Sequence, residues 1–266
     1  DGTLCTGAAV CVILIMNGVP AWLAMIFAFI AGIIAGFVTG IFNTRFGIPP
    51  ILAGILTQLA LYSINLHIMG WGTEAFSKAN LPINADNYKL LLSSRHVRST
   101  GLNNPIVVLV ILTVIVIGLL YWFFGTELGS SLRATGANGN MARAQGINTD
   151  FTKVLGLMLS NGMVAVAGAL LAQYQGFSDI NMGRGSIVIG LAAVIIGEVI
   201  FSKFLRPFWG KLLSCVFGAI IYYIVIQIVL KLGLSTDDLK LLSALVVALF
   251  LAVPYWKANY ASKHVK

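Results

Sequence analysis

The chain has 266 residues, of which 58% are apolar and only 10% are charged, and its mean hydropathy is +0.92. A soluble domain of this size does not need so much apolar surface, whereas a protein that crosses a membrane several times does, because lipid contacts its outer face. The formal charge of +8 would indicate nucleic acid in a soluble protein. In a membrane protein it indicates basic loops that meet anionic lipid, so we expect the lipid bilayer as a partner and no nucleic acid.

Eight apolar runs follow one another along the chain and predict an all-α, polytopic integral membrane helical bundle, with one transmembrane domain over residues 1–266. The runs cover 4–16, 21–42, 51–70, 106–124, 151–173, 185–201, 207–230 and 239–254. Two of them, 4–16 and 185–201, are short or broken. The first would be about 20 Å long as a helix, less than the ~30 Å core of a bilayer. It is typical of a half-helix that lines a polar pathway, and equally of an ordinary span that begins before Asp1.

A row of small residues marks the second run, where Gly32, Gly36 and Gly40 recur at every fourth position. Residues spaced in this way lie on one face of a helix and allow a second helix to approach closely. The row therefore predicts a helix–helix contact and carries no chemistry of its own.

Five polar residues within or beside the apolar runs are candidates for lining a solute pathway. They are Asn17, Gln58, Asn65, Asn161 and Glu198. Gln58 and Asn65, seven residues apart, fall on one face of a helix. Amides at these places line a pathway or bond a neighbouring helix, and both interpretations remain open. For Glu198 we favour an interfacial carboxylate paired with Lys203 or Arg206, because a carboxylate that faces lipid is costly.

Two polar stretches interrupt the apolar runs. Residues 71–105 mix charged residues with a short apolar interlude and predict a folded cap on the extracytoplasmic face. Residues 125–152 contain a glycine-punctuated island. Here Gly136, Asn138 and Gly139 predict a turn, residues 140–145 predict one short helix capped by Asn138 or Asn140, and Gly146 predicts its end.

The positions of the basic residues predict which face is cytoplasmic. If the loop at 125–153 is inside, the cytoplasmic loops hold ten Lys and Arg residues, against three in the short loops outside. Short cytoplasmic loops are enriched in Lys and Arg, so the count places the 125–152 loop in the cytoplasm.

Several segments also resemble a known family. They are Arg133-Ala-Thr-Gly-Ala-Asn138, Ala142-Arg-Ala-Gln-Gly-Ile-Asn148 and Ala167-Gly-Ala-Leu-Leu-Ala172. Together they resemble the permease subunits of ABC importers, in the branch of the branched-chain amino acid and ribose permeases. The run from Asn181-Met-Gly-Arg-Gly to Glu198 is similar to a sub-branch associated with aromatic amino acid uptake.

The resemblance implies a multi-pass protein of the bacterial cytoplasmic (inner) membrane and several partners. These are a separate ABC ATPase subunit, an extracytoplasmic substrate-binding protein and a second permease copy. It further implies that a helix precedes the Asp-Gly-Thr at residues 1–3, and that the 125–152 loop is the coupling helix that docks on the ATPase. The residues expected at that contact are Gly136, Ala137, Asn138, Met141, Ala142, Arg143, Gly146 and Ile147. A structured loop without a partner remains the alternative.

The expected function is therefore transport of a small polar solute, an amino acid in the first place, with a ribose-type sugar as the alternative. No Gly-rich loop ending in Gly-Lys-Ser/Thr is present, so ATP is expected to be handled by another chain and no cofactor is expected here. An ion-coupled secondary transporter is disfavoured because few ionisable residues lie within the apolar runs. Cys5, Cys11 and Cys215 lie in apolar runs without metal-ligand spacing, so we expect neither a metal site nor an enzyme.

Overall fold

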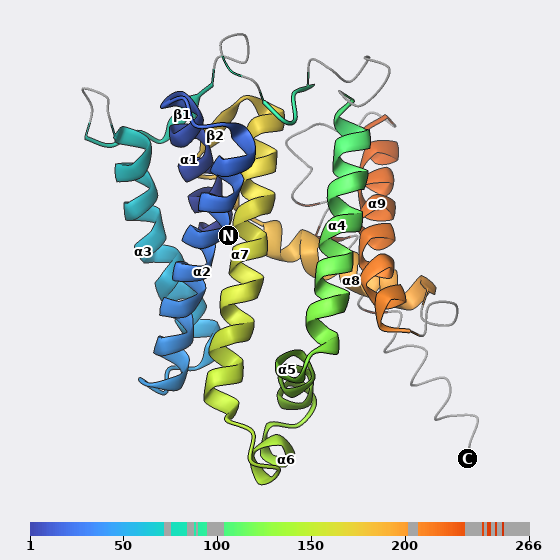
Figure 1. The fold of residues 1–266 in the computed structure, drawn as a ribbon. Coiled ribbons are helices and arrows are strands. Elements are labelled where there is room, and N and C mark those ends of the chain that lie inside the picture. Colours follow the sequence, from blue (N-terminus) through green and yellow to red (C-terminus); the bar gives the residue numbers. More distant parts are fainter. Residues whose placement is uncertain are drawn as a thin grey trace. The chain divides into compact units, whose positions relative to one another are not determined.

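The computed structural model describes residues 1–71, 76–83, 88, 90–94, 104–201 and 207–231, together with the single residues 241, 244, 245, 248 and 252. The chain divides into two compact units, Asp1–Arg184 and Gly185–Lys266, which are treated separately below. Figure 1 labels the helices and strands of both units.

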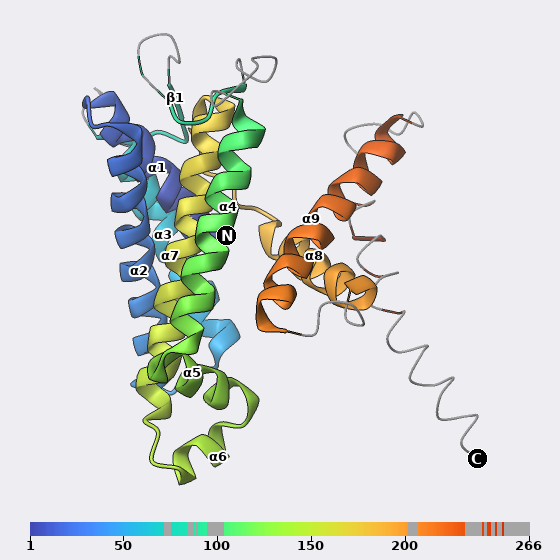
Figure 2. The same cartoon turned by 45° about the vertical axis from the view of Figure 1, so that its right-hand side comes forward.

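Five apolar helices build the first unit. They are α1 (Gly2–Met16), α2 (Ala21–Thr44), α3 (Pro50–Gly70), α4 (Pro105–Gly125) and α7 (Thr149–Gln175). Helices α1, α2, α3 and α7 pack against one another, as Figures 1 and 2 show. All of these except α1 are long and apolar enough to cross a membrane.

The glycine row of α2 contacts α7, as its spacing predicts. A Cβ atom placed on Gly32 would lie 2.5 Å from the carbonyl oxygen of Asn161, and one placed on Gly36 would overlap the backbone of Leu157. Gly40 faces Val154 in the same way, so α2 and α7 run antiparallel. In lipid the hydrophobic effect does not drive helices together, so close backbone approach stabilises the α2–α7 pair through van der Waals contacts.

Helix α1 runs in the same direction as α7 and begins beside its middle. Thr3 Oγ1 donates a hydrogen bond of 2.8 Å to Asn161 Oδ1, and Gln173 Nε2 donates one of 3.3 Å to Cys11 Sγ. Because α7 has 27 residues and is about 40 Å long, Asn161 lies near its midpoint. The first turn of α1 is therefore level with the middle of the bundle.

A two-stranded sheet covers one end of the first unit. Strand β1 (Asn80–Pro82) pairs antiparallel with β2 (Phe177–Asp179), which follows α7 directly. Leu81, Ile83 and Ile180 join a buried cluster with residues of α1, α3 and α7. The predicted cap, in its described part, is thus packed on the bundle, and Gln173 Oε1 fixes it further by accepting a hydrogen bond of 3.1 Å from Leu91 N.

The opposite end of the unit carries two short helices between α4 and α7, namely α5 (Glu127–Ala137) and α6 (Gly139–Ala144). The sequence predicts one short helix here, and α5 is missing from that prediction. The expected turn at Gly136 is wrong, because Gly136 lies within α5.

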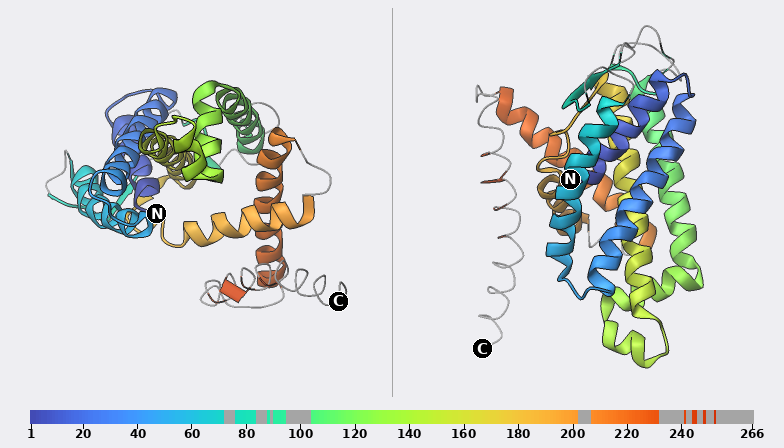
Figure 3. Two further views of the ribbon diagram at one scale, coloured as in Figure 1. Left: turned by 90° about the horizontal axis from the view of Figure 1, so that it is seen from below. Right: turned by 90° about the vertical axis from the view of Figure 1, so that its left-hand side faces the viewer.

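The second unit consists, in its described part, of α8 (Ser186–Phe201) and α9 (Phe208–Lys231), which cross in Figure 3. Ala192 and Ile196 of α8 pack on Tyr222 and Ile226 of α9 and form the buried cluster of this unit. Across both units the described residues contain five helices of spanning length and two shorter apolar ones. These seven match predicted runs, while the eighth run, 239–254, falls almost entirely outside the described residues.

Candidate functional site

Helix α5 forms because its first turn is well capped. Thr126 Oγ1 accepts a hydrogen bond of 3.3 Å from Gly129 N, and Glu127 places a negative charge in the first turn. Both features stabilise a helix start by satisfying free N–H groups and by opposing the helix dipole. Their sum offsets the ~1 kcal/mol that Gly136 costs inside a helix.

Helix α6 has the cap and the end that the sequence predicts. Asn138 Oδ1 accepts hydrogen bonds of 3.1 Å from the backbone N–H groups of Asn140 and Met141. Gly146 has a φ of 81°, a conformation that side chains with a Cβ atom rarely adopt, and it follows the last turn directly. Asn138 as cap and Gly146 as end are therefore confirmed.

Side chains tie this pair of helices to α7. Arg143 Nη2 donates a hydrogen bond of 2.8 Å to Thr149 Oγ1, and Thr135 Oγ1 lies 3.0 Å from Thr152 Oγ1. Asn148 caps α7 by accepting a hydrogen bond from Phe151 N at 3.1 Å. The exposed ion pair of Arg143 with Asp150, at 3.9 Å, adds about 0–1 kcal/mol at most. The loop is therefore held rigidly on the end of α7.

The eight residues expected at a partner contact do not share one environment. Six of them are exposed and Ile147 is half-buried, whereas Ala142 is fully buried. A partner contact of Ala142 stays a prediction, and in this structure its methyl group does not reach the surface. Met141, next to it, is 49% exposed and presents an apolar side chain at the surface.

The five candidate pathway residues also have different surroundings. Asn17 is exposed at the end of α1, where Nδ2 donates to Ile13 O, and Glu198 is exposed on α8 of the second unit. Asn161 is engaged by Thr3. Gln58 and Asn65, in contrast, line the same cavity, as their shared helix face predicts. The suggested Glu198 partners Lys203 and Arg206 lie outside the described residues.

The cavity beside Gln58 and Asn65 lies at the start of α1 and has a volume of about 120 Å³. Its lining comes from α3, the first residues of the chain and the segment after β2. The residues are Asp1, Gly2, Cys5, Gln58, Leu59, Tyr62, Asn65, Ile180, Gly183 and Arg184. Because Thr3 contacts Asn161, the cavity is level with the middle of α7.

Non-helical backbone reaches this depth after β2. Cys5 Sγ donates to Ile180 O at 3.2 Å and accepts from Gly183 N at 3.3 Å, so the chain turns back from the sheet toward the start of α1. Irregular backbone at membrane depth is tolerated where it is buried in protein or lines a polar cavity. Tyr62, Arg184 and Cys5 also line the cavity and were not predicted from the sequence. Only Arg184 lies in a motif that could have indicated it, the run Asn181-Met-Gly-Arg-Gly.

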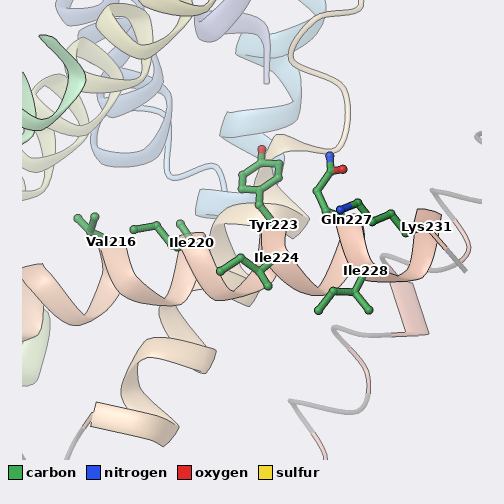
Figure 4. A pocket seen from close by; sticks show the side chains of 8 residues that line it. Val216, Ile220, Tyr223, Ile224, Gln227, Ile228 and Lys231 are labelled. Atoms are coloured by element: carbon green, nitrogen blue, oxygen red, sulfur yellow. The ribbon is translucent and has the colours of Figure 1, made fainter. Parts of the chain in front are cut away.

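The second unit offers a larger but open space of about 570 Å³ along α9, shown in Figure 4. Its lining residues all belong to this one helix and recur at intervals of three or four. They are Val216, Ala219, Ile220, Tyr223, Ile224, Gln227, Ile228 and Lys231. The space is therefore an exposed helix face and not an enclosed site. Among the described residues, no group of His, Cys, Asp and Glu is arranged to hold a metal ion.

Two of the known proteins that resemble this chain do so over nearly its whole length, and a third over 65% of it. It is 40% identical to the tyrosine transport system permease protein of Clostridioides difficile (strain R20291), over 95% of this chain and 79% of that protein. An uncharacterized protein of Rickettsia prowazekii (strain Madrid E) is 33% identical over 95% of this chain and 85% of its own length. The autoinducer 2 import system permease protein LsrC of Yersinia pestis (strain Pestoides F) is 31% identical over 65% of this chain and 46% of that protein. No solved structure gives a significant match.

A family model described as branched-chain amino acid transport system / permease component matches residues 1–254. This match, together with the apolar helices, makes the chain a multi-pass protein of the bacterial cytoplasmic (inner) membrane. The chain belongs to the family of branched-chain amino acid transport system permease components.

Proposed function

We propose that this permease conducts an amino acid, in the first place an aromatic one, as the membrane subunit of an ATP-driven importer. The observation that carries the proposal is the 40% identity to a tyrosine transport permease over 95% of the chain. A ribose-type sugar is the second candidate solute, because the amides Gln58 and Asn65 in the cavity wall suit a polar solute of either kind.

The partners follow from the same proposal. A separate ATPase binds and hydrolyses ATP, an extracytoplasmic protein delivers the solute, and a second copy of the permease completes the pathway. The sequence supports ATP hydrolysis by a separate subunit, because it contains no phosphate-binding loop of the Gly-Lys-Ser/Thr type.

The segment Gly136–Ile147, which holds α6 and the last residues of α5, is proposed as the docking element for the ATPase. It is exposed, it carries Met141 at its surface, and it is tied to α7 through Arg143 and through the neighbouring Thr135. A rigid-body movement of α6 would be passed to α7, then to α2 through the glycine row and to α1 through Thr3. The start of α1 lines the cavity, so this path joins the docking element to the candidate solute site.

Reconstitution tests the proposed function directly. The permease, its ATPase and its delivery protein are placed in proteoliposomes, and ATP-dependent uptake of labelled L-tyrosine, L-tryptophan, L-leucine and D-ribose is compared. Uptake of an amino acid that stops when ATP is withheld supports the proposal. If only ribose is taken up in an ATP-dependent way, the transported solute is the sugar and not an amino acid. Uptake independent of ATP would contradict an ATP-driven importer.

The topology gives a further prediction. Ser130 of α5 and Ser77 beside β1 are both exposed, at opposite ends of the first unit. In a background with Cys5, Cys11 and Cys215 replaced by Ser, we expect Ser77→Cys to react with an impermeant thiol reagent added outside intact cells. Ser130→Cys should react only after the membrane is opened. Reaction of both from outside would contradict a cytoplasmic α5–α6 pair.

The hydrogen bond between Arg143 of α6 and Thr149 of α7 leads to a prediction about the rate of ATP-driven uptake. Arg143→Met removes the hydrogen bond to Thr149 and should lower ATP-driven uptake several-fold, because one of the two side-chain contacts that carry movement from the loop to α7 is lost. Thr149→Val removes the same bond from the other side. The double variant should be no slower than the slower single variant, since residues that act through one contact are not additive. If the fold-loss of uptake in the double variant equals the product of the two single fold-losses, the two side chains act separately.

A further inference from the structure

A buried acceptor on α3 has no protein partner within the described part of the chain. Asn65 is fully buried, and its Nδ2 donates a hydrogen bond of 3.2 Å to Gly2 O, which fixes the orientation of the amide. The Oδ1 atom is left without a hydrogen bond among the described residues. A buried acceptor left without any partner costs about 1–3 kcal/mol, so a water molecule or a ligand group is expected to donate to it.

The cavity around Asn65 indicates which kind of ligand would donate a hydrogen bond to its Oδ1 atom. The cavity that it lines also holds a carboxylate, Asp1, and a guanidinium, Arg184. Arg184 is exposed, and no described acidic residue forms an ion pair with its side chain. A cation at this depth is costly unless water or an anion meets it. The cavity wall thus offers a hydrogen-bond acceptor (Asn65 Oδ1), a negatively charged group (Asp1) and a positively charged group (Arg184).

The volume limits what enters. About 120 Å³ is well below the ~300–1,000 Å³ of sites that enclose a whole ligand, yet several times the ~30 Å³ of one water molecule. The head of an amino acid, with its ammonium and carboxylate groups on one carbon, fits this space. A larger side chain would extend past Leu59 and Tyr62, which are 64% and 43% exposed.

We propose that this cavity is a contact site for the zwitterionic head of the transported amino acid. Asn65 Oδ1 accepts a hydrogen bond from the ammonium group, and Arg184 pairs with the carboxylate. Tyr62 lies where an aromatic side chain of the solute would pack. This inference rests on the proposed function, since it assigns the binding groups for the proposed class of solute.

Cys5 has a positioning role in this arrangement. Its sulfur bonds both Ile180 O and Gly183 N, and so it holds the segment that presents Arg184. Cys5→Ser should preserve both bonds and binding, whereas Cys5→Ala should weaken binding of the carboxylate and leave binding of an amine without carboxylate unchanged.

The experiment uses the permease–ATPase complex in nanodiscs, without the delivery protein, and saturation-transfer NMR, a method suited to weak ligands. The probes are L-tyrosine, tyramine, which lacks the carboxylate, 3-(4-hydroxyphenyl)propionate, which lacks the ammonium, and D-ribose. The variants are Asn65→Leu, Asn65→Asp and Arg184→Gln. His67→Leu is the matched control, since His67 is exposed two residues further along α3 and does not line the cavity.

We expect L-tyrosine to bind wild type and His67→Leu equally, and to bind Asn65→Leu and Arg184→Gln at least about tenfold more weakly, a loss of ~1.4 kcal/mol. Asn65→Asp should retain tyramine binding, and Arg184→Gln should abolish the advantage of L-tyrosine over tyramine. Arg184 is exposed, so its variant is expected to fold even if Asn65→Leu does not.

Unchanged L-tyrosine binding in a folded Asn65→Leu and in Arg184→Gln would overturn the inference, and so would a cavity that binds none of the probes and holds water alone. Uptake by the complete transporter separates this result from the proposed function. Amino acid uptake that persists with wild-type KM in both variants would refute the site and leave the function standing. A wild-type complex that takes up no amino acid would refute the function itself.

Discussion

Met141→Asp should uncouple ATP hydrolysis from the solute. Met141 is the exposed apolar side chain of α6, and an aspartate there would place a charge in the proposed contact with the ATPase. Removing an apolar contact of this kind costs at least ~1.4 kcal/mol of binding, or a factor of ten. We expect solute-stimulated ATPase activity of the reconstituted complex to fall at least about tenfold, and the ATPase to be lost during purification.

The fold of the loop should survive this change, because Asp at the third position of α6 is compatible with the start of a helix. Leu128→Asp is the matched control, since Leu128 is 50% exposed and lies in the first turn of α5. Equal activity of Met141→Asp and wild type would show that α6 does not dock on the ATPase. A larger residue at Ala142 would test docking less clearly, because overpacking a buried position destabilises the loop itself by about 1–3 kcal/mol.

Gly36→Leu should prevent the first unit from assembling. A Cβ atom on Gly36 would overlap backbone atoms of Leu157 on α7, and backbone cannot turn aside as a flexible side chain does. Overpacking costs about 1–3 kcal/mol where side chains give way, and we expect ~3 kcal/mol or more here. The yield of monodisperse protein after detergent extraction should therefore fall sharply.

Gly54→Leu on α3 is the matched control, because nothing lies within 4 Å of a Cβ atom at that position. It introduces the same residue into an apolar helix of similar length and should leave the yield near that of wild type. A normal yield of Gly36→Leu would mean that α2 and α7 can separate without loss of the fold.

The spans and the ends of α6 could be predicted from the sequence because their causes are local. An apolar run of about 20 residues has few alternatives to a helix in lipid, and seven predicted runs are helices in the described chain. Asn138 caps α6 and Gly146 ends it through bonds and dihedral angles within a few residues. The glycine spacing of α2 predicted a close contact, but not that α7 is the partner.

Only the tertiary structure decided which polar residues lie together. The five candidate pathway residues look alike as isolated polar positions, yet Gln58 and Asn65 share a cavity while Asn17 and Glu198 are exposed elsewhere. Arg184 joins them because bonds from Cys5 hold the segment after β2 against α1, and those partners are more than 170 residues apart in the chain. The burial of Ala142 could not be predicted from the sequence either, because the composition around Gly136 does not predict α5. Helix propensity and residue spacing predict a helix and which residues share a face of it. Which helix packs against that face depends on contacts between residues far apart in the sequence.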